Sequence, residues 1–366
     1  MNILLAIDSL RPGGKERQLV QLLRGLHQRG NVNMELAVTR PEIGYPEVRQ
    51  LGIPIHVIRR NNKWDMAGFK QFLSIARAFQ ADVIHTWDPI TTILALPAVK
   101  RLRIKLVNES IRHALPIRRF SKLWWLARTL FPLSDIVVAN SMAGLRTYGL
   151  IPSSRAVCIY NGFDPSRATD IESSQGLRSG LGIETPLVVG MVANFVDAKD
   201  YGTFLKAAMA ISQTRDDVTF VCVGDGPLMP RMKEMVPSQL LHRILFPGRQ
   251  QNVEAIVNEF DIGVLTCNTN GHAEGLSNAI MEYMGLGKPV VATDSGGNSE
   301  ILVQRETGFI IPPFDAGVLE SELRRLLDDP ALRATMGTAG NRRILDVFSM
   351  KNLVDSHLDI YKRVVS

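Results

Sequence analysis

The stretch that decides the fold is residues 274–293, EGLSNAIMEYMGLGKPVVAT. Ser277 is a favourable N-cap, and the apolar residues 278–284 predict a short helix directly after it. The glycines and the proline within residues 285–289 predict the end of that helix. The apolar run 290–293 then predicts a buried strand. Loop, helix and strand in this order form one unit of an alternating α/β fold.

The same alternation extends along most of the chain. Amphipathic patterns such as residues 16–29 and 66–79 predict helices that cover a sheet. Parallel sheets with helical crossovers are the architecture typical of this alternation. The predicted strands fall at residues 3–7, 34–39, 53–58, 83–87, 105–108, 136–139 and 156–160, then at 187–192, 218–223, 244–247, 262–267, 290–293 and 309–311.

The alternation pauses at residues 164–186, which are rich in Ser, Gly, Arg and acidic residues. This composition predicts a linker between two domains. We therefore expect two doubly wound, Rossmann-like domains whose ligands bind beyond the carboxyl ends of the strands. The first domain is predicted to span residues 1–170 together with a C-terminal helical segment, 347–366, and the second to span residues 185–346.

Several classes of protein are disfavoured by what the sequence lacks. No Gly-x-Gly-x-x-Gly follows a strand, and no Gly-x-x-x-x-Gly-Lys-Ser/Thr is present. Cys158, Cys222 and Cys267 have no spacing typical of a disulfide framework or a metal site. No apolar run is long enough for a membrane span, and the amino terminus lacks a signal-peptide pattern. A reducing, cytoplasmic setting is expected.

The positive charge is concentrated in the first part of the chain. Residues 1–170 hold 24 basic and 12 acidic residues, whereas the remainder holds 18 basic and 24 acidic residues. Basic and aromatic residues gather in one helical segment, which favours an interfacial helix on anionic lipid at the inner face of the cell membrane. An ordinary amphipathic helix with its tryptophans packed inside fits the same pattern. The residues concerned are Arg118, Arg119, Lys122, Trp124 and Trp125.

Two glutamates, Glu274 and Glu282, stand eight positions apart around the predicted helix start. The first amides of that helix, at residues 277–279, lack intrahelical acceptors and carry the positive end of the helix dipole, so they suit a phosphate or diphosphate. Glu282 lies in an apolar run, where an unpaired buried carboxylate would be costly. A pair of glutamates on a solvated helix face is the ordinary alternative.

In these residues the chain resembles the retaining nucleotide-sugar glycosyltransferases of family 4. That resemblance implies the GT-B fold, in which two Rossmann-like domains face a central cleft and the C-terminal helix crosses back to the first domain. It implies that Glu282 holds the nucleotide ribose and that Glu274 faces the donor sugar. The helix start between them, Gly275, Leu276, Ser277 and Asn278, would bind the donor.

The resemblance also implies roles for three loops. Lys199 stands at the family's phosphate-binding lysine, and a lysine at a helix start is disfavoured unless an anion compensates it. Asn194 stands where many members have an arginine, so one expected positive charge is absent. The pair Gly13 and Gly14 resembles the glycine-rich loop that approaches the donor diphosphate. The turn at residues 224–227 also matches the family, and a structural role is expected there.

The first domain departs from the family at its expected strand-end histidine. Glu109, Ser110 or Arg112 occupies that position, and Arg112 is predicted as the catalytic cation, with His113 as a nearby substitute. His85 ends a strand on the side expected to face the cleft, although a structural histidine fits equally well.

The expected activity is transfer of a hexosyl unit from a UDP- or GDP-sugar, with UDP favoured, to a hydroxyl of a saccharide or lipid-linked acceptor, with retention of the anomeric configuration. Envelope polysaccharide or glycoconjugate synthesis is the expected context. The chain has no Asp-x-Asp, so no catalytic metal and no cofactor are expected, and no nucleic-acid partner is predicted. A nucleotide-sugar epimerase of the same fold, or an inactive scaffold subunit, are the alternatives.

Overall fold

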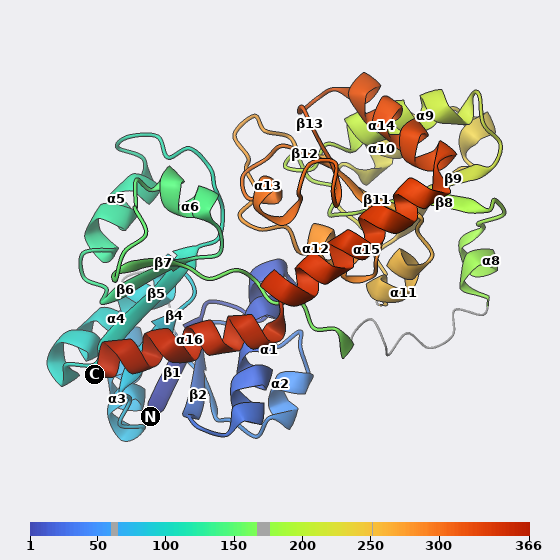
Figure 1. Ribbon diagram of the computed structural model, residues 1–366. Coiled ribbons are helices and arrows are strands. Elements are labelled where there is room, and N and C mark those ends of the chain that lie inside the picture. The colour runs from blue at the N-terminus through green and yellow to red at the C-terminus, as the bar shows by residue number, and fades with distance from the viewer. Residues whose placement is uncertain (60–64, 167–175, 251) are drawn as a thin grey trace. The chain divides into compact units, whose positions relative to one another are not determined.

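The computed structural model describes residues 1–59, 65–166, 176–250 and 252–366. Contacts divide the chain into two compact units. The first comprises Met1–Gly162 together with Met350–Ser366, and the second comprises Phe163–Ser349. Each unit is built on one parallel sheet (Figure 1).

The first unit contains a seven-stranded sheet in the order β3-β2-β1-β4-β5-β6-β7. Its strands alternate between the two faces of the sheet, as β1 illustrates: Ile3, Leu5 and Ile7 join one core cluster, and Leu4 and Ala6 join the other. The strands are β1 (Asn2–Ile7), β2 (Asn33–Val38), β3 (Ile55–Val57), β4 (Val83–Thr86), β5 (Lys105–Ile111), β6 (Ile136–Ala139) and β7 (Ala156–Cys158).

Helices cover both faces of this sheet. One core cluster combines the sheet with α1 and α16, which lie side by side (Figure 1), and the other combines it with α3 and α4. The C-terminal helix therefore returns to the first unit, as predicted. The helices are α1 (Gly14–Arg29), α2 (Glu47–Gln50), α3 (Met66–Ala78), α4 (Pro89–Leu102), α5 (Lys122–Leu130), α6 (Met142–Thr147) and α16 (Met350–Val365).

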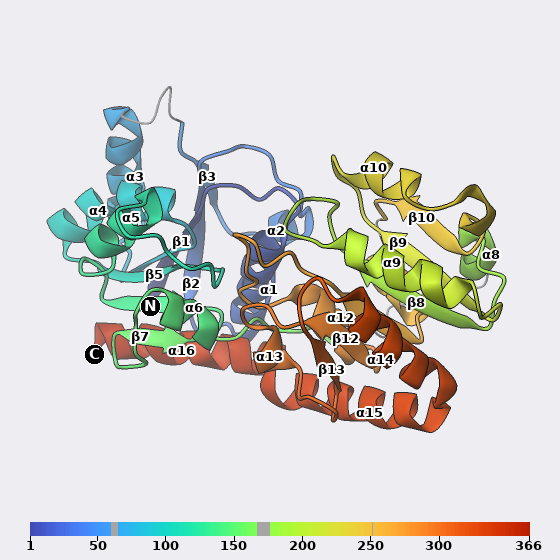
Figure 2. The same ribbon diagram turned by 90° about the horizontal axis from the view of Figure 1, so that it is seen from above.

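The second unit contains a six-stranded sheet in the order β10-β9-β8-β11-β12-β13. The helices α9 and α14 pack side by side against it (Figure 2). The strands are β8 (Leu187–Val192), β9 (Val218–Val223), β10 (Ile244–Gly248), β11 (Ile262–Leu265), β12 (Val290–Thr293) and β13 (Gly308–Ile311). The helices are α8 (Leu177–Leu181), α9 (Tyr201–Ser212), α10 (Met229–Glu234), α11 (Val253–Asn258), α12 (Asn278–Gly285), α13 (Asn298–Ile301), α14 (Ala316–Asp328) and α15 (Pro330–Val347).

The predicted fold of two doubly wound parallel sheets is confirmed, with small differences at the element ends. The strand β5 continues to Ile111, beyond the predicted end at residue 108, because Ile111 still pairs with Ala139 across an irregularity. The predicted linker contains the short helix α8, while its residues 167–175 lie outside the described part of the chain. No helix in the described segments combines the length and apolarity needed to cross a bilayer.

Candidate active site

The segment that opened the sequence analysis forms the start of α12. Ser277 is buried, and its hydroxyl accepts a hydrogen bond from the Ile280 amide at 3.5 Å, so it is the predicted N-cap. Gly275 and the buried Leu276 precede it, and Asn278 is the first residue of the helix. The sequence therefore located this helix start correctly.

A glycine pair after β12 holds the backbone of Glu274. The Gly297 amide donates to the Glu274 carbonyl at 3.2 Å. Gly296 has a φ of 56°, and a Cβ atom there would lie 1.8 Å from the same carbonyl oxygen. Because no side chain fits in that space, Gly296 fixes where Glu274 can lie.

Lys199 and Glu274, both predicted as catalytic, form an ion pair through Nζ and Oε1. Burial opposes the charge on Lys199, but the neighbouring Glu274 outweighs it, so the pKa of the lysine is raised above its ordinary value. The side chains are 18% and 23% exposed, so the pair remains accessible. The anion that compensates the lysine charge is therefore the first glutamate of the motif, Glu274.

The pair has a neighbour that the sequence did not indicate. Cys267 Sγ lies 3.8 Å from Glu274 Oε1, and Cys267 forms an isolated antiparallel bridge with Lys199. Burial raises the pKa of the Cys267 thiol to about 12, which keeps it neutral. The thiol is thus a poor nucleophile. The apolar strand pattern around Cys267 predicted only that the residue is buried, not that it lies beside Glu274.

A cavity of about 330 Å³ adjoins the lysine. Its lining residues come from the segment after β8, the start of α9, the region of α10 and the segment after β11. Asp200, which caps α9 by accepting from the Thr203 amide at 3.0 Å, lies in the same wall. The cavity is lined by Phe195, Asp197, Lys199, Asp200, Tyr201, Gly202, Leu228, Arg231, Met232 and Asn268.

Glu282, the predicted ribose ligand, lies within α12 and is 4% exposed. Asn194, in the turn after β8, is exposed. The turn that contains Asn194 is held by the predicted glycine turn: a Cβ at Gly224 would lie 1.9 Å from the Ala193 carbonyl oxygen, and the φ of Gly224 is 142°. The glycines there have the structural role expected from the sequence.

In the first unit, Gly13 caps α1 and Gly14 is its first residue, so the glycine pair opens the helix as predicted. The Tyr45 hydroxyl accepts from the Gly13 amide at 3.0 Å and donates to the Gly13 carbonyl at 2.9 Å. These two bonds fix the loop before α1.

Arg112 follows β5 and is anchored by three contacts. Its Nη2 lies 2.6 Å from Glu109 Oε1, its Nη1 donates to Asn161 at 3.2 Å, and its guanidinium lies 4.0 Å above the Trp87 ring. Arg112 lines a cavity of about 210 Å³ with Ser110 and His113, whereas Glu109 is fully buried and does not line it. Of the three candidates for the altered strand end, Ser110 and Arg112 therefore reach this cavity.

His85 is fully buried and structural, so the expectation that it faces a cleft is not met. Its Nδ1 lies 2.7 Å from the Tyr361 hydroxyl, and its Nε2 lies 2.8 Å from Glu109 Oε2. Burial lowers the pKa of His85 to about 4, against the opposing effect of Glu109, so the ring is neutral. Its partner on α16 is far along the chain, which is why the strand pattern could not reveal this burial.

One group in the described part of the chain brings at least three potential metal ligands together: His85, Glu109 and His357 offer atoms within 4.8 Å of one another. Their contacts of 2.8 and 2.9 Å are hydrogen-bond lengths, and Arg112 already neutralises the carboxylate. We interpret the group as a hydrogen-bonded network.

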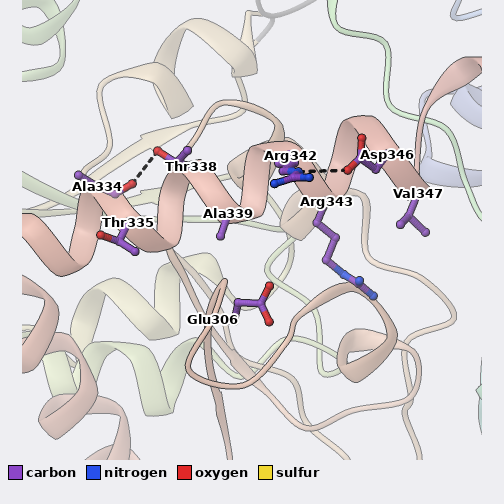
Figure 3. Close-up of a pocket in the computed structure, with 9 residues that line it drawn as sticks. All are labelled: Glu306, Ala334, Thr335, Thr338, Ala339, Arg342, Arg343, Asp346 and Val347. Atoms are coloured by element: carbon purple, nitrogen blue, oxygen red, sulfur yellow. Dashed lines mark hydrogen bonds and ion pairs between the residues drawn. The ribbon is translucent and has the colours of Figure 1, made fainter.

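A larger hollow of about 690 Å³ lies along α15 (Figure 3). Glu306, Arg342 and Asp346 are among its lining residues, and Arg342 pairs with Asp346 at 3.5 Å along the helix. None of the predicted site residues lines it. Its size therefore does not identify it as the active site.

Two sequence families match the chain: Glycosyltransferase Family 4 over residues 12–167 and Glycosyl transferases group 1 over residues 186–329. The lipopolysaccharide core biosynthesis glycosyltransferase LpsD of Rhizobium meliloti (strain 1021) is 26% identical over 363 residues, 97% of this chain and 96% of LpsD. The N-acetyl-alpha-D-glucosaminyl L-malate synthase of Bacillus anthracis is 25% identical, with 82% of this chain and 80% of that protein covered.

The fold is similar to that of HepE from Anabaena, solved in complex with UDP, with a TM-score of 0.84 and 21% identity over 99% of this chain and 100% of HepE. These findings define a sugar-transferring enzyme of the GT-B fold. The chain belongs to the family 4-like glycosyltransferases and is a hexosyltransferase.

The close approach at Gly296 leads to a stability prediction. Gly296→Ala should lower the free energy of unfolding by about 3 kcal/mol or more, because a methyl group would collide with the Glu274 carbonyl. Gly271→Ala is the matched control, since Gly271 has a φ of 80° but nothing within 4 Å of its Cβ position. That control should cost about 1 kcal/mol, the strain alone. Equal losses in urea denaturation would contradict the proposed contact.

Proposed function

We propose that this enzyme transfers a hexosyl unit from a UDP-sugar to a hydroxyl of a saccharide or lipid-linked acceptor, in envelope polysaccharide or glycoconjugate synthesis. The observation that carries the proposal is the Lys199–Glu274 pair beside the capped start of α12. It joins a cation, a carboxylate and the amide end of a helix, which together suit a sugar diphosphate.

The comparisons support the finer parts of this proposal. LpsD is named for lipopolysaccharide core synthesis, and HepE has been solved with UDP and with UDP-glucose. GDP remains the second candidate nucleotide, because a mannosyltransferase of Corynebacterium glutamicum that is 29% identical over 192 residues is named as GDP-mannose-dependent. LpsD and the Corynebacterium glutamicum enzyme are named for sugar transfer, which favours a transferase over an epimerase or an inactive scaffold.

In the proposed reaction the bond between the anomeric carbon and the diphosphate oxygen breaks while the acceptor oxygen bonds to the same face of that carbon. The acceptor hydroxyl proton passes to the departing phosphate oxygen, so the products are the glycoside and the nucleoside diphosphate. Lys199 and the first amides of α12 stabilise the charge that develops on the leaving group. Glu274 then exchanges its contact with Lys199 for the donor sugar, and Glu282 holds the ribose. No metal is required in this scheme.

We further propose that α5 rests on an anionic membrane surface. Ser121 caps the helix, and Phe120 and Trp125 are 63% and 56% exposed. Trp124 packs edge-on against Trp125 at 4.7 Å and lies under Arg128, whose guanidinium carbon is 5.0 Å from the ring centroid. An exposed aromatic cluster beside basic side chains suits the boundary between head groups and acyl chains.

The nucleotide assignment predicts selective stabilisation. UDP at 100 times its dissociation constant should add about 2.7 kcal/mol to the free energy of unfolding. Thermal melts with UDP, GDP, ADP and CMP should show one responsive nucleotide, and Glu282→Ala should abolish its effect. Glu234→Ala, which changes an exposed glutamate on α10, is the control and should keep it. No response to any of the four nucleotides would count against a sugar-nucleotide enzyme.

The proposed role of Lys199 predicts a kinetic loss. Lys199→Ala should reduce kcat by about 10²–10³-fold, because a cation that stabilises the leaving diphosphate is removed. Lys206→Ala, at an exposed position of α9, should leave kcat unchanged. Donor-saturated turnover measures both. An unchanged kcat in Lys199→Ala would refute the assignment.

The membrane proposal predicts charge-dependent binding. Arg118→Gln combined with Arg119→Gln should weaken binding to phosphatidylserine-containing vesicles by about 2 kcal/mol, since each basic residue near such a surface contributes about 1 kcal/mol. Ile151→Ala, which removes an isolated apolar side chain that is 82% exposed, should not weaken it. Vesicle co-sedimentation provides the measurement, with phosphatidylcholine vesicles as the uncharged reference. Equal binding of wild type to both vesicle types would contradict the proposal.

A further inference from the structure

A buried histidine on the C-terminal helix makes two contacts that each require a proton. His357 is fully buried. Its Nδ1 lies 2.8 Å from the Leu353 carbonyl oxygen, which can only accept, so Nδ1 carries a hydrogen. Its Nε2 lies 2.9 Å from Glu109 Oε2. A neutral ring with its hydrogen on Nδ1 would point a lone pair at that oxygen.

Glu109 is held in its ionised form. Burial alone would raise its pKa, but the Arg112 guanidinium, whose Nη2 lies 2.6 Å from Glu109 Oε1, and the neighbouring histidines lower the pKa well below its ordinary value. An ionised carboxylate only accepts hydrogen bonds. Nε2 of His357 must therefore carry a hydrogen as well, which makes the ring an imidazolium.

The other groups that face this carboxylate fit the same assignment. The neutral His85 contacts the Tyr361 hydroxyl through Nδ1 at 2.7 Å, and its Nε2 lies 2.8 Å from Glu109 Oε2. Arg112 contacts the second oxygen, Oε1, at 2.6 Å. Arg112 and His357 contact the same carboxylate, and the Trp87 ring lies near both: Arg112 is 4.0 Å from its centroid, and the His357 ring stacks at 6.5 Å with an interplanar angle of 11°.

This chain of contacts ends at a cavity. The Arg112 side chain is 13% exposed and lines the cavity that also includes Lys15, Ser110 and His113. Glu109 contacts the Arg112 guanidinium through Oε1 and His357 through Oε2, so His357 holds the carboxylate that positions Arg112. Without that anchor, the carboxylate would keep only the neutral His85 and Arg112 itself.

We propose that His357 is a positioning residue: as an imidazolium it fixes Glu109, and Glu109 fixes the Arg112 guanidinium at the edge of the first-unit cavity. The C-terminal helix thereby orients Arg112, which lies in the segment directly after β5. The kinetic part of this proposal rests on the proposed transferase function, whereas the protonation state can be measured without any substrate.

The protonation state is tested by NMR of the full-length protein with ¹⁵N-labelled histidine. At about pH 8, where an exposed histidine is neutral, His357 should show hydrogens on both ring nitrogens. The exposed His242 provides the internal reference signal in the same spectra. A single ring hydrogen on His357 would overturn the proposal, as would one equivalent of bound metal in the purified protein, because a metal ion would take the place of the Nε2 hydrogen.

The positioning role is tested by paired variants. His357→Gln keeps an N–H donor in reach of Glu109, so it should retain most of the wild-type kcat, whereas His357→Leu should lower kcat by about a hundredfold. In an Arg112→Ala background, His357→Leu should have no further effect on kcat, because it acts through Arg112. The role would be overturned if the kcat losses of Arg112→Ala and His357→Leu multiplied in the double variant. It would also be overturned if His357→Gln and His357→Leu lost kcat equally while their melting temperatures stayed unchanged. If no donor supports turnover in the wild type, the proposed function fails while the NMR result stands.

Discussion

All strand pairs in the described parts of both sheets are parallel, and the chemistry of the second unit depends on that constraint. Parallel strands end at the same edge, so the segments that follow them gather there. Lys199 follows β8, Glu274 follows β11 and Gly296 follows β12, and these three strands are neighbours in the sheet. Residues 75 positions apart thereby form an ion pair.

In each unit a buried or partly buried charge is paired with a charge of the opposite sign. Glu109 is fully buried but contacts Arg112 and His357, and Lys199 contacts Glu274. Removing one partner of such a pair is costly because it leaves an uncompensated charge in a poorly solvated place. The two arrangements differ in access, however. The Lys199–Glu274 pair is partly exposed and can exchange partners with a ligand, whereas Glu109 is sealed and suited only to holding its neighbours in place.

Local patterns were sufficient to predict the strands, the main helices and the start of α12, because apolar periodicity and capping residues act within a few positions. The bounds of β6, β8, β9 and β12 agree with the prediction residue for residue. Contacts between residues far apart in the sequence could not be predicted from such local patterns. Cys267 was visible only as a strand residue, and the partner of Glu109 is 248 positions away on α16. A single sequence contains no signal for such a pairing.

The C-terminal helix shows why such a distant contact can nevertheless be well defined. Leu353, Val354 and Leu358 pack into the core shared with α1, while His357 and Tyr361, one turn apart, face Glu109 and His85. Successive residues of a helix point about 100° apart, so a slip by one position would remove the apolar and the polar contacts together. Packing of the apolar face therefore fixes the position and rotation of α16, and with them the position of His357 beside Glu109. Core packing on the apolar face of α16 therefore determines where His357 lies relative to Glu109.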